Sequence, residues 1–243
     1  IYNSGTGKFE YTPNAGFEGA DQFSYTITDA DGDTSTATVY LNVDADSTPA
    51  VSVTYVEGQD YVDEAALSDG SNPSSDDEST SGSFPITHTG TDTTAKFEIE
   101  DKDGIKVDVT SGGTVAGLYG TLQVFESGGN YTWTYTLDDN TTDHPTNPGS
   151  GTAEGIQEDF ALFVTDSDGD VSPNASLVID VLDDGPSAVD DGSVGSPIGV
   201  AEDAVAHEID ALDNDTFGAD NPLNSVAVTT GASNGTAIYN SGT

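Results

Sequence analysis

The sequence predicts an all-β protein made of tandem β-sandwich domains, with no significant helix. Short segments rich in Tyr, Phe, Val and Ile recur throughout the 243 residues, and turns rich in Gly, Asn and Asp separate them. No segment keeps the apolar period of a helix. The hexapeptide at 1–6 also returns unchanged at 238–243, which predicts one 237-residue period (238 minus 1) of a tandem array.

Residues 1–46 predict the C-terminal half of a sandwich domain. A first strand is expected at 8–12 and a second at 23–28, because apolar residues alternate with polar ones in both. The acidic turn 29–33 then leads into a returning strand at 36–43, which is rich in β-branched residues. We therefore expect a hairpin with an acidic tip.

Residues 47–184 predict one complete sandwich, reached through a linker at 44–49 and left through a second linker at 183–186. Two long polar loops are expected, at 68–81 and 138–153. The strands are expected at 51–55, 83–88, 95–100, 104–110, 120–125, 131–137, 160–165 and 177–182.

Residues 185–243 predict the N-terminal half of the next copy of the domain to which residues 1–46 belong. Strands are expected at 202–209 and 225–230, but no closing hairpin follows them. Joined through the repeated hexapeptide, 186–243 followed by 7–46 makes one domain of about 100 residues. Neither half, at about fifty residues, buries enough core to be stable alone. We therefore expect neighbouring repeats to complete each other head to tail.

The charge of the chain is extreme, with 44 acidic residues against four lysines and a formal net charge of −40. Nucleic acid and anionic membrane surfaces are excluded as partners, because clustered Lys and Arg bind both. So much like charge opposes compaction and calls for cations, either as bound divalent metal or as high salt. The chain has no cysteine, and no apolar run approaches the roughly 18 residues that membrane insertion requires.

No catalytic motif marks an enzyme. The chain lacks a nucleophile elbow, a zinc-protease motif and a phosphate-binding loop. Paired carboxylates for glycoside cleavage remain an alternative in so acidic a chain, but no apolar pocket to raise one carboxyl pKa is evident. We therefore expect a protein without catalytic activity.

Two turns share the pattern Asp-x-Asp-Gly-Asp, at 29–33 and 166–170. Carboxylates at alternate positions around a glycine can converge on one hard cation, and calcium takes about 6–8 oxygen ligands. The alternative is that Asp and Gly simply make a good tight turn. In a sandwich, the turn between the last two strands faces the preceding linker, so Asp44 and Asp46 are expected to meet the 166–170 turn.

The same reasoning applies to the second junction. The acids after the central domain are expected to meet the 29–33 turn of the composite domain, with two more acids from the following loop at the same end. These residues are Asp183, Asp184, Asp190 and Asp191, with Asp213 and Asp215 from the loop. Clusters of this size need cations, so we predict calcium at both junctions.

Two stretches carry a resemblance to known families. Glu202-Asp203 and Leu212–Asp215, taken with Tyr11–Tyr25 and Thr28–Asp33, resemble the bacterial cadherin-like (tandem-95) repeat. Residues 47–184, with the motifs Glu64–Leu67, Gly82–Phe84 and Val164–Asp170, resemble the long repeat of type I-secreted RTX giant adhesins. Together the two cover nearly the whole chain, and they imply Ig-like or cadherin-like sandwiches.

The resemblance also implies calcium ligands. In cadherins a Glu early in each domain binds junctional calcium together with Asp-x-Asp pairs, and Glu202 and, less closely, Glu64 fall at comparable places. The chain departs from cadherins in lacking a clear Asp-x-Asn-Asp-Asn linker. The predicted calcium ligands are Asp29, Asp31, Asp33, Asp44, Asp46, Asp166, Asp168, Asp170, Asp183, Asp184, Asp190, Asp191, Glu202, Asp213 and Asp215.

Other conspicuous side chains are interpreted as structural. Tyr131, Trp133 and Tyr135 share one face of a predicted strand, which favours the core over an exposed platform for sugars. The histidines lack metal-ligand spacing and are expected to be solvated residues of loops or strands. They are His88, His144 and His207.

These features predict an extracellular extender repeat of a large calcium-dependent bacterial surface adhesin, supporting cell adhesion and biofilm formation. Calcium at each junction would stiffen the array, and the adhesion ligand is not readable from the sequence. The alternative is a sandwich module of the same adhesin that binds a glycan or protein through loops 68–81 and 138–153. Verbatim repetition favours the extender, because a ligand-binding head is usually placed once, at a tip.

Overall fold

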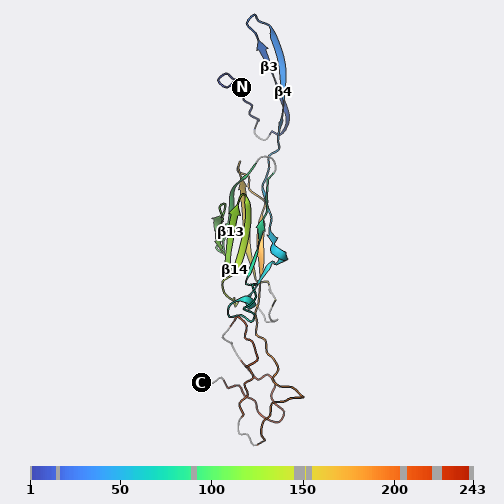
Figure 1. The fold of residues 1–243 in the computed structure, drawn as a ribbon, viewed down its shortest axis with the longest axis vertical. Helices are drawn as coiled ribbons and strands as arrows, with labels where there is room; N and C mark the ends of the chain where they lie inside the picture. Colours follow the sequence, from blue (N-terminus) through green and yellow to red (C-terminus); the bar gives the residue numbers. More distant parts are fainter. Residues whose placement is uncertain are drawn as a thin grey trace.

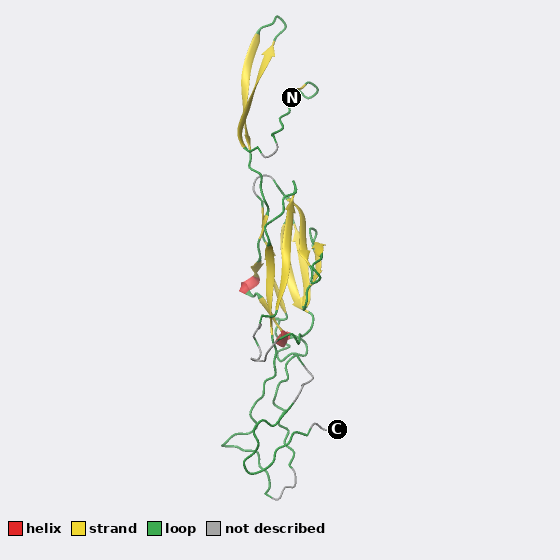
Figure 2. Ribbon diagram, turned by 180° about the vertical axis from the view of Figure 1, so that it is seen from behind, coloured by secondary structure: helices red, strands yellow, loops and turns green. Residues whose placement is uncertain are grey.

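The chain is arranged along one long axis as an N-terminal hairpin segment, a central β-sandwich and a C-terminal segment (Figure 1). The described residues hold strands and two short 3₁₀ turns but no α-helix, so the predicted all-β fold is confirmed (Figure 2). No helix in this part of the chain is long and apolar enough to cross a bilayer. This computed structural model describes residues 2–14, 17–88, 92–144, 151, 155–202, 207–220 and 226–240.

Two five-stranded sheets form the central sandwich. One has the order β11-β10-β15-β16-β7 and the other the order β12-β13-β14-β8-β6. Neighbouring strands are antiparallel, except that β16 and β7 run parallel. The strand bounds are β6 (Thr54–Tyr55), β7 (Tyr61–Asp63), β8 (Ser79–Phe84), β10 (Thr94–Glu100), β11 (Lys106–Asp108), β12 (Gly113–Ala116), β13 (Gly120–Ser127), β14 (Asn130–Leu137), β15 (Gln157–Asp166) and β16 (Ala175–Leu182).

The core lies between the two sheets, and strict alternation along the strands builds it. In β14 every second residue is buried, from Tyr131 to Leu137, as the strand period of two requires. Trp133 is 1% exposed, and its ring stands edge-on to Tyr55 and stacks on Phe84. The predicted core role of the three aromatic residues of this strand is therefore confirmed.

Gly82 allows β6, β8 and the Trp133 ring to approach one another. A Cβ atom at this position would collide with the Thr54 carbonyl oxygen and would lie 2.7 Å from Trp133 Cζ2. Gly82 pairs with Trp133 on one side and with Tyr55 on the other. A glycine is needed here because backbone and ring together fill the space of a side chain.

Glu158, on β15, is a buried acid with a complete set of donors. It is 2% exposed, and its carboxyl oxygens accept backbone N–H bonds from Leu118, Tyr119 and Gly120 at 2.7–3.2 Å. The Tyr135 hydroxyl donates a further bond of 2.7 Å. Burial and the adjacent Glu158 raise the pKa of that hydroxyl. The group ties the β12–β13 turn to the core, and sequence reasoning did not identify it.

The edges of the sandwich differ from expectation. The predicted strand 83–88 is split at Pro85, because proline has no N–H for a ladder bond, into β8 and the short β9 (Ile86–Thr87). The predicted strand 51–55 is split into β5 (Ala50–Val51), which pairs with β9, and β6. Neither β7 nor β12 was expected, since each is only three or four residues long. The 3₁₀ turns are η1 (Val56–Gly58) and η2 (Glu64–Ala66).

The N-terminal segment contains two separate strand pairs. β3 (Gly19–Thr28) and β4 (Thr34–Val43) form the expected hairpin, while β1 (Tyr2–Asn3) pairs with β2 (Lys8–Phe9). Phe9 lies 5.0–5.3 Å from the rings of Phe23 and Tyr25, measured between centroids, but no described residue from 2 to 46 is buried. A hairpin with one small aromatic group is marginal by itself.

The C-terminal segment, from residue 186, has no strand in the part that the structure describes. Its only described ladder contacts are the isolated bridges Ser187–Thr216 and Ser193–Ser196. The strands expected at 202–209 and 225–230 are therefore not found in their described parts, while 203–206 and 225 lie outside the described residues. A strand forms only when its backbone finds a partner, and these stretches find none among the described residues.

Candidate metal sites at the two ends of the sandwich

The two Asp-x-Asp-Gly-Asp turns have the same internal hydrogen bonding. Asp166 Oδ1 accepts the N–H of Gly169 at 3.1 Å and of Asp170 at 2.8 Å, and Asp29 Oδ1 accepts those of Gly32 and Asp33 at the same distances. The glycines have φ of 111° and 103°, values that other residues rarely adopt. The first aspartate of each turn is therefore fixed by the backbone, and the remaining carboxylates are left to gather beside it.

At the N-terminal end of the sandwich, the linker meets the second of these turns. One carboxyl oxygen each from Asp46, Asp168 and Asp170 lie within 4.8 Å of one another, and a second group of three joins Asp92 to Asp166 and Asp168. We call these five residues the N-terminal cluster. Asp46 comes from the linker, Asp92 precedes β10, and the others surround the end of β15.

Hydrogen bonds hold the linker against this end. Ser47 is 3% exposed, and its hydroxyl donates to Asp92 Oδ2 at 2.6 Å. The Ser167 hydroxyl donates to the other oxygen of Asp92 at 3.4 Å. The strand register explains why Asp92 lies beside the turn. Thr94 at the start of β10 pairs with Asp166 at the end of β15, and Asp92 is two residues before Thr94.

Mutual repulsion marks the N-terminal cluster electrostatically. The contact with Asp166, burial and the charges of Asp166 and Asp92 raise the pKa of Asp168 to about 6. The charge of Asp46, followed by burial, raises the pKa of Asp170. Asp166 is 1% exposed, and its Oδ2 atom has no hydrogen-bond partner within the described structure. An unsatisfied buried oxygen among repelling carboxylates is the environment that a cation stabilises.

The first turn, at Asp29, Asp31 and Asp33, lies at the far tip of the β3–β4 hairpin, away from the sandwich (Figure 1). One oxygen from each of the three exposed carboxylates lies within 4.8 Å of the others. The hydrogen bond with Asp31 lowers the pKa of Asp29 more than burial raises it. No part of the second linker approaches this turn within the described chain.

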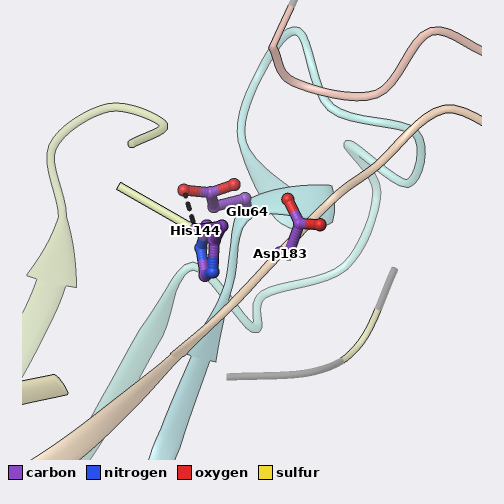
Figure 3. A group of neighbouring side chains, drawn as sticks. All are labelled: Glu64, His144 and Asp183. Atoms are coloured by element: carbon purple, nitrogen blue, oxygen red, sulfur yellow. Dashed lines mark ion pairs between the residues drawn. The ribbon is translucent and has the colours of Figure 1, made fainter. Parts of the chain in front are cut away.

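A second group lies at the C-terminal end of the sandwich, and Figure 3 shows its three side chains. The C-terminal cluster consists of Glu64, His144 and Asp183, with ligand atoms within 4.8 Å of one another. Glu64 opens η2 directly after β7, and Asp183 directly follows β16. The parallel pairing of Leu182 with Asp63 brings these two carboxylates side by side.

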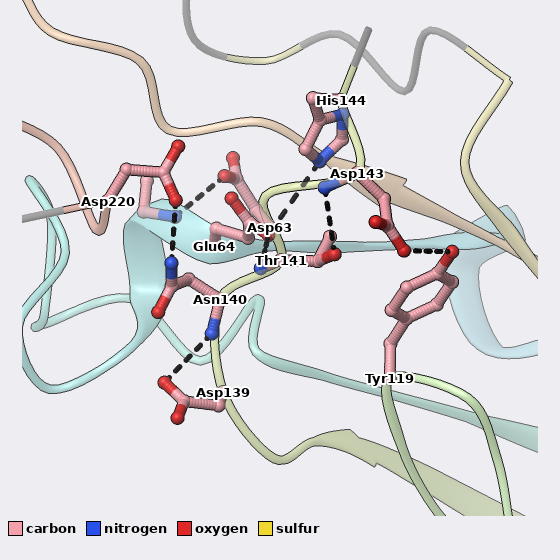
Figure 4. A network of polar contacts seen from close by, with 10 residues as sticks. Asp63, Glu64, Tyr119, Asp139, Asn140, Thr141, Asp143, His144 and Asp220 are labelled. Carbon is pink, nitrogen blue, oxygen red and sulfur yellow. Dashed lines mark hydrogen bonds and ion pairs between the residues drawn. The ribbon is translucent and has the colours of Figure 1, made fainter. Parts of the chain in front are cut away.

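The loop after β14 supplies the imidazole. Thr141 N–H donates to Glu64 Oε1 at 2.6 Å, and His144 Nε2 lies 3.7 Å from the same oxygen. The same loop also contacts the β12–β13 turn, where the Tyr119 hydroxyl donates to Asp143 Oδ2 at 3.3 Å (Figure 4).

The C-terminal segment also contacts this end of the sandwich, beside the C-terminal cluster. Asn140 Nδ2 donates to Asp220 Oδ1 at 2.6 Å (Figure 4), and Ala219 is 1% exposed within the core. Ser71 donates two bonds, of 2.7 and 2.6 Å, to the fully buried Asp184. Burial raises the pKa of Glu64 to about 7, although the backbone N–H groups of Thr141 and Asp184 oppose the shift.

The predicted ligands are thus only partly brought together. Asp46, Asp166, Asp168 and Asp170 meet as expected, and Asp183 belongs to the C-terminal cluster. The others lie apart from both clusters within the described structure. Asp29, Asp31 and Asp33 form their own exposed group at the hairpin tip. Asp44 accepts from Asn42, Asp184 from Ser71 and Asp215 from the Val189 N–H, while Asp190, Asp191, Glu202 and Asp213 are exposed.

Two residues were missed or misread. His144 was expected to be solvated, but its side chain is only 5% exposed because the loop folds back over Glu64. Asp92 was not among the predicted calcium ligands, although its position between the predicted strands 83–88 and 95–100 indicated a place at one end of the sandwich. No sequence pattern pointed to His144, since its partners are 80 and 39 residues away (144 minus 64, and 183 minus 144).

A comparison with known families fits this architecture. A model of the bacterial Ig domain family matches residues 1–42. A search of curated proteins finds no match for the chain. The N-terminal part is therefore similar to a bacterial Ig-like domain, a type of domain typical of surface and secreted proteins, and the match identifies no catalytic family.

Proposed function

We propose that this chain is a structural extender segment of a large calcium-dependent bacterial surface adhesin. The observation that carries the proposal is the meeting of linker and turn in the N-terminal cluster. Asp46 belongs to the linker, whereas Asp168 and Asp170 belong to the sandwich, and their carboxyl oxygens lie within 4.8 Å. A cation bound by both sides would fix the angle between two consecutive segments.

Calcium is the cation that suits this donor set. The N-terminal cluster offers only oxygen ligands, and calcium accepts 6–8 of them at about 2.3–2.6 Å, with water completing the shell. Extracellular modules bind calcium with dissociation constants of about 10⁻⁴–10⁻³ M. The net charge of −40 adds a general need for counter-cations. In this proposal calcium binding outside the cell contributes folding free energy and stiffens the rod.

The proposal includes a tandem array, in which 185–243 and 1–46 are halves of one domain. Exposed apolar side chains on the hairpin support it, since Ile27 is 63% and Tyr40 is 77% exposed. In a following repeat, the 29–33 turn would meet Asp190 and Asp191 and form the second calcium junction. The partner of each segment is then a neighbouring copy, head to tail.

The test is to add calcium to the whole chain and follow both stability and shape. We expect millimolar calcium to raise the melting temperature and to shift small-angle scattering toward a stiffer, longer particle. Magnesium at the same concentration controls for general screening, because it prefers a tighter octahedral shell. Identical melting and scattering curves in calcium and in chelator would refute the proposal.

A further inference from the structure

The C-terminal cluster differs in chemistry from the N-terminal cluster, because it contains an imidazole. Glu64 is fully buried, Asp183 is 5% exposed and the side chain of His144 is 5% exposed. Glu64 forms no ion pair with a lysine in the described structure: Lys96 and Lys102 pair with Glu98 and Asp103, and Lys106 lies over the Phe163 ring. The positive charge expected next to the fully buried Glu64 is therefore not supplied by lysine.

Three polar atoms of this group are buried and unsatisfied. Glu64 Oε2 and both ring nitrogens of His144 are buried without a hydrogen-bond partner in the described structure. Buried polar atoms are nearly always satisfied, and an exception calls for an explanation such as a bound water or a bound ion. Nε2 of His144 lies 3.7 Å from Glu64 Oε1, too far for a hydrogen bond.

The spacing suits a small metal ion. Two ligands bound at about 2.1 Å to a tetrahedral ion lie about 3.4 Å apart, close to the separation of the imidazole and Glu64. Calcium takes oxygen ligands almost exclusively, whereas imidazole with carboxylates is typical of zinc and other first-row transition ions. We propose that Glu64, His144 and Asp183 form a binding site for a divalent transition metal such as Zn²⁺, separate from the calcium junction.

The position of the site gives such an ion a structural role. It would join three segments that are distant in sequence: η2, the loop after β14, and the linker that follows β16. The Asn140–Asp220 bond already attaches this loop to the C-terminal segment. Metal would therefore fasten the loop and the second linker to the end of the sandwich. This inference does not depend on calcium binding at the other end.

The test is to add Zn²⁺ alone to the metal-free whole chain and to single variants. With zinc about 100-fold above its dissociation constant, we expect the melting temperature to rise by about 5–10 °C. Glu64→Gln keeps the oxygen that accepts from Thr141, so it should fold, yet we expect zinc affinity to fall about 100-fold or more. His144→Gln should lower zinc affinity in the same way. His207→Gln changes an exposed histidine outside the site and is the matched control, which should bind zinc as the wild type does.

Cobalt gives a readout that does not depend on stability. Co²⁺ bound by His144 and two carboxylates should show visible absorption bands of a low-coordinate ion, and these should vanish in His144→Gln and persist in His207→Gln. Asp168→Asn should leave the zinc response intact, which separates this site from the calcium junction. An equal zinc response in the wild type, Glu64→Gln and His144→Gln would overturn the proposal. So would a calcium response that is lost in Glu64→Gln while zinc has none.

Discussion

Asp168→Asn is the substitution that acts most directly on the N-terminal cluster. Asp168 belongs to both groups of three carboxylates at this end, so it is the residue through which Asp46 and Asp92 are linked. Its raised pKa of about 6 shows that the charge is unfavourable when no cation is present. Asparagine has nearly the same shape and removes the charge. We therefore expect opposite effects with and without calcium.

The size of the calcium effect follows from mass action. With a dissociation constant of about 10⁻⁴–10⁻³ M, 10 mM calcium stabilises the folded chain by about 1.4–2.7 kcal/mol per site. At about 2–4 °C for each kcal/mol, the melting temperature of the wild type should rise by about 3–11 °C. In Asp168→Asn most of this increment should be lost, because one ion loses a ligand and a charge. In chelator the variant should melt at a higher temperature than the wild type.

The assay is thermal unfolding followed by circular dichroism, in EDTA and in 10 mM calcium. The control is Asp159→Asn, an exposed aspartate on the same strand, β15, and outside the N-terminal cluster. It should gain as much from calcium as the wild type does. If Asp168→Asn gained the full increment, Asp168 would not be a ligand and the reasoning from its pKa would fail.

Three further predictions follow from the structure. In chelator, the melting temperature should rise as the pH falls from 7.5 to 5.5. The folded-state pKa values of Asp168 (about 6) and Glu64 (about 7) lie above their ordinary values, so over this range the folded chain binds more protons than the unfolded chain and is stabilised by acid. A melting temperature that falls over this range would contradict the direction of these pKa shifts. Trp133→Ala should cost about 3–5 kcal/mol in a urea titration, because the ring is buried between Tyr55 and Phe84; a cost below about 1 kcal/mol would mean that the core is not where we place it. Sedimentation velocity should show association that grows with protein concentration, because residues 1–46 and 185–243 are proposed to complete each other; a compact monomer at every concentration would exclude this.

Much of the fold could be read from local patterns. The alternation of Tyr131, Trp133 and Tyr135 predicted a core strand, and the residues around Asp29–Asp33 predicted a hairpin with an acidic tip; both are confirmed. Such features depend on residues close together in sequence. The short β7 and β12 could not be predicted in this way, because they form only where longer strands offer them an edge.

The site was predictable where topology follows from one rule. The turn between the last two strands lies near the preceding linker, so Asp46 and the 166–170 turn were expected to meet, and they do. The C-terminal cluster required knowledge of two further facts. One is the parallel pairing of β7 with β16, and the other is the path of the loop that carries His144. Neither leaves a signal in the spacing of Glu64, His144 and Asp183.

A crystal structure from calcium-containing solution tests the central proposal most directly. It should show an ion between Asp46, Asp168 and Asp170, with oxygen ligands at about 2.3–2.6 Å and with the linker fixed against the sandwich. Anomalous scattering would separate this ion from water. Water alone at hydrogen-bond distance, with the Asp46 side chain turned away into solvent, would contradict the claim that calcium joins the linker to the domain.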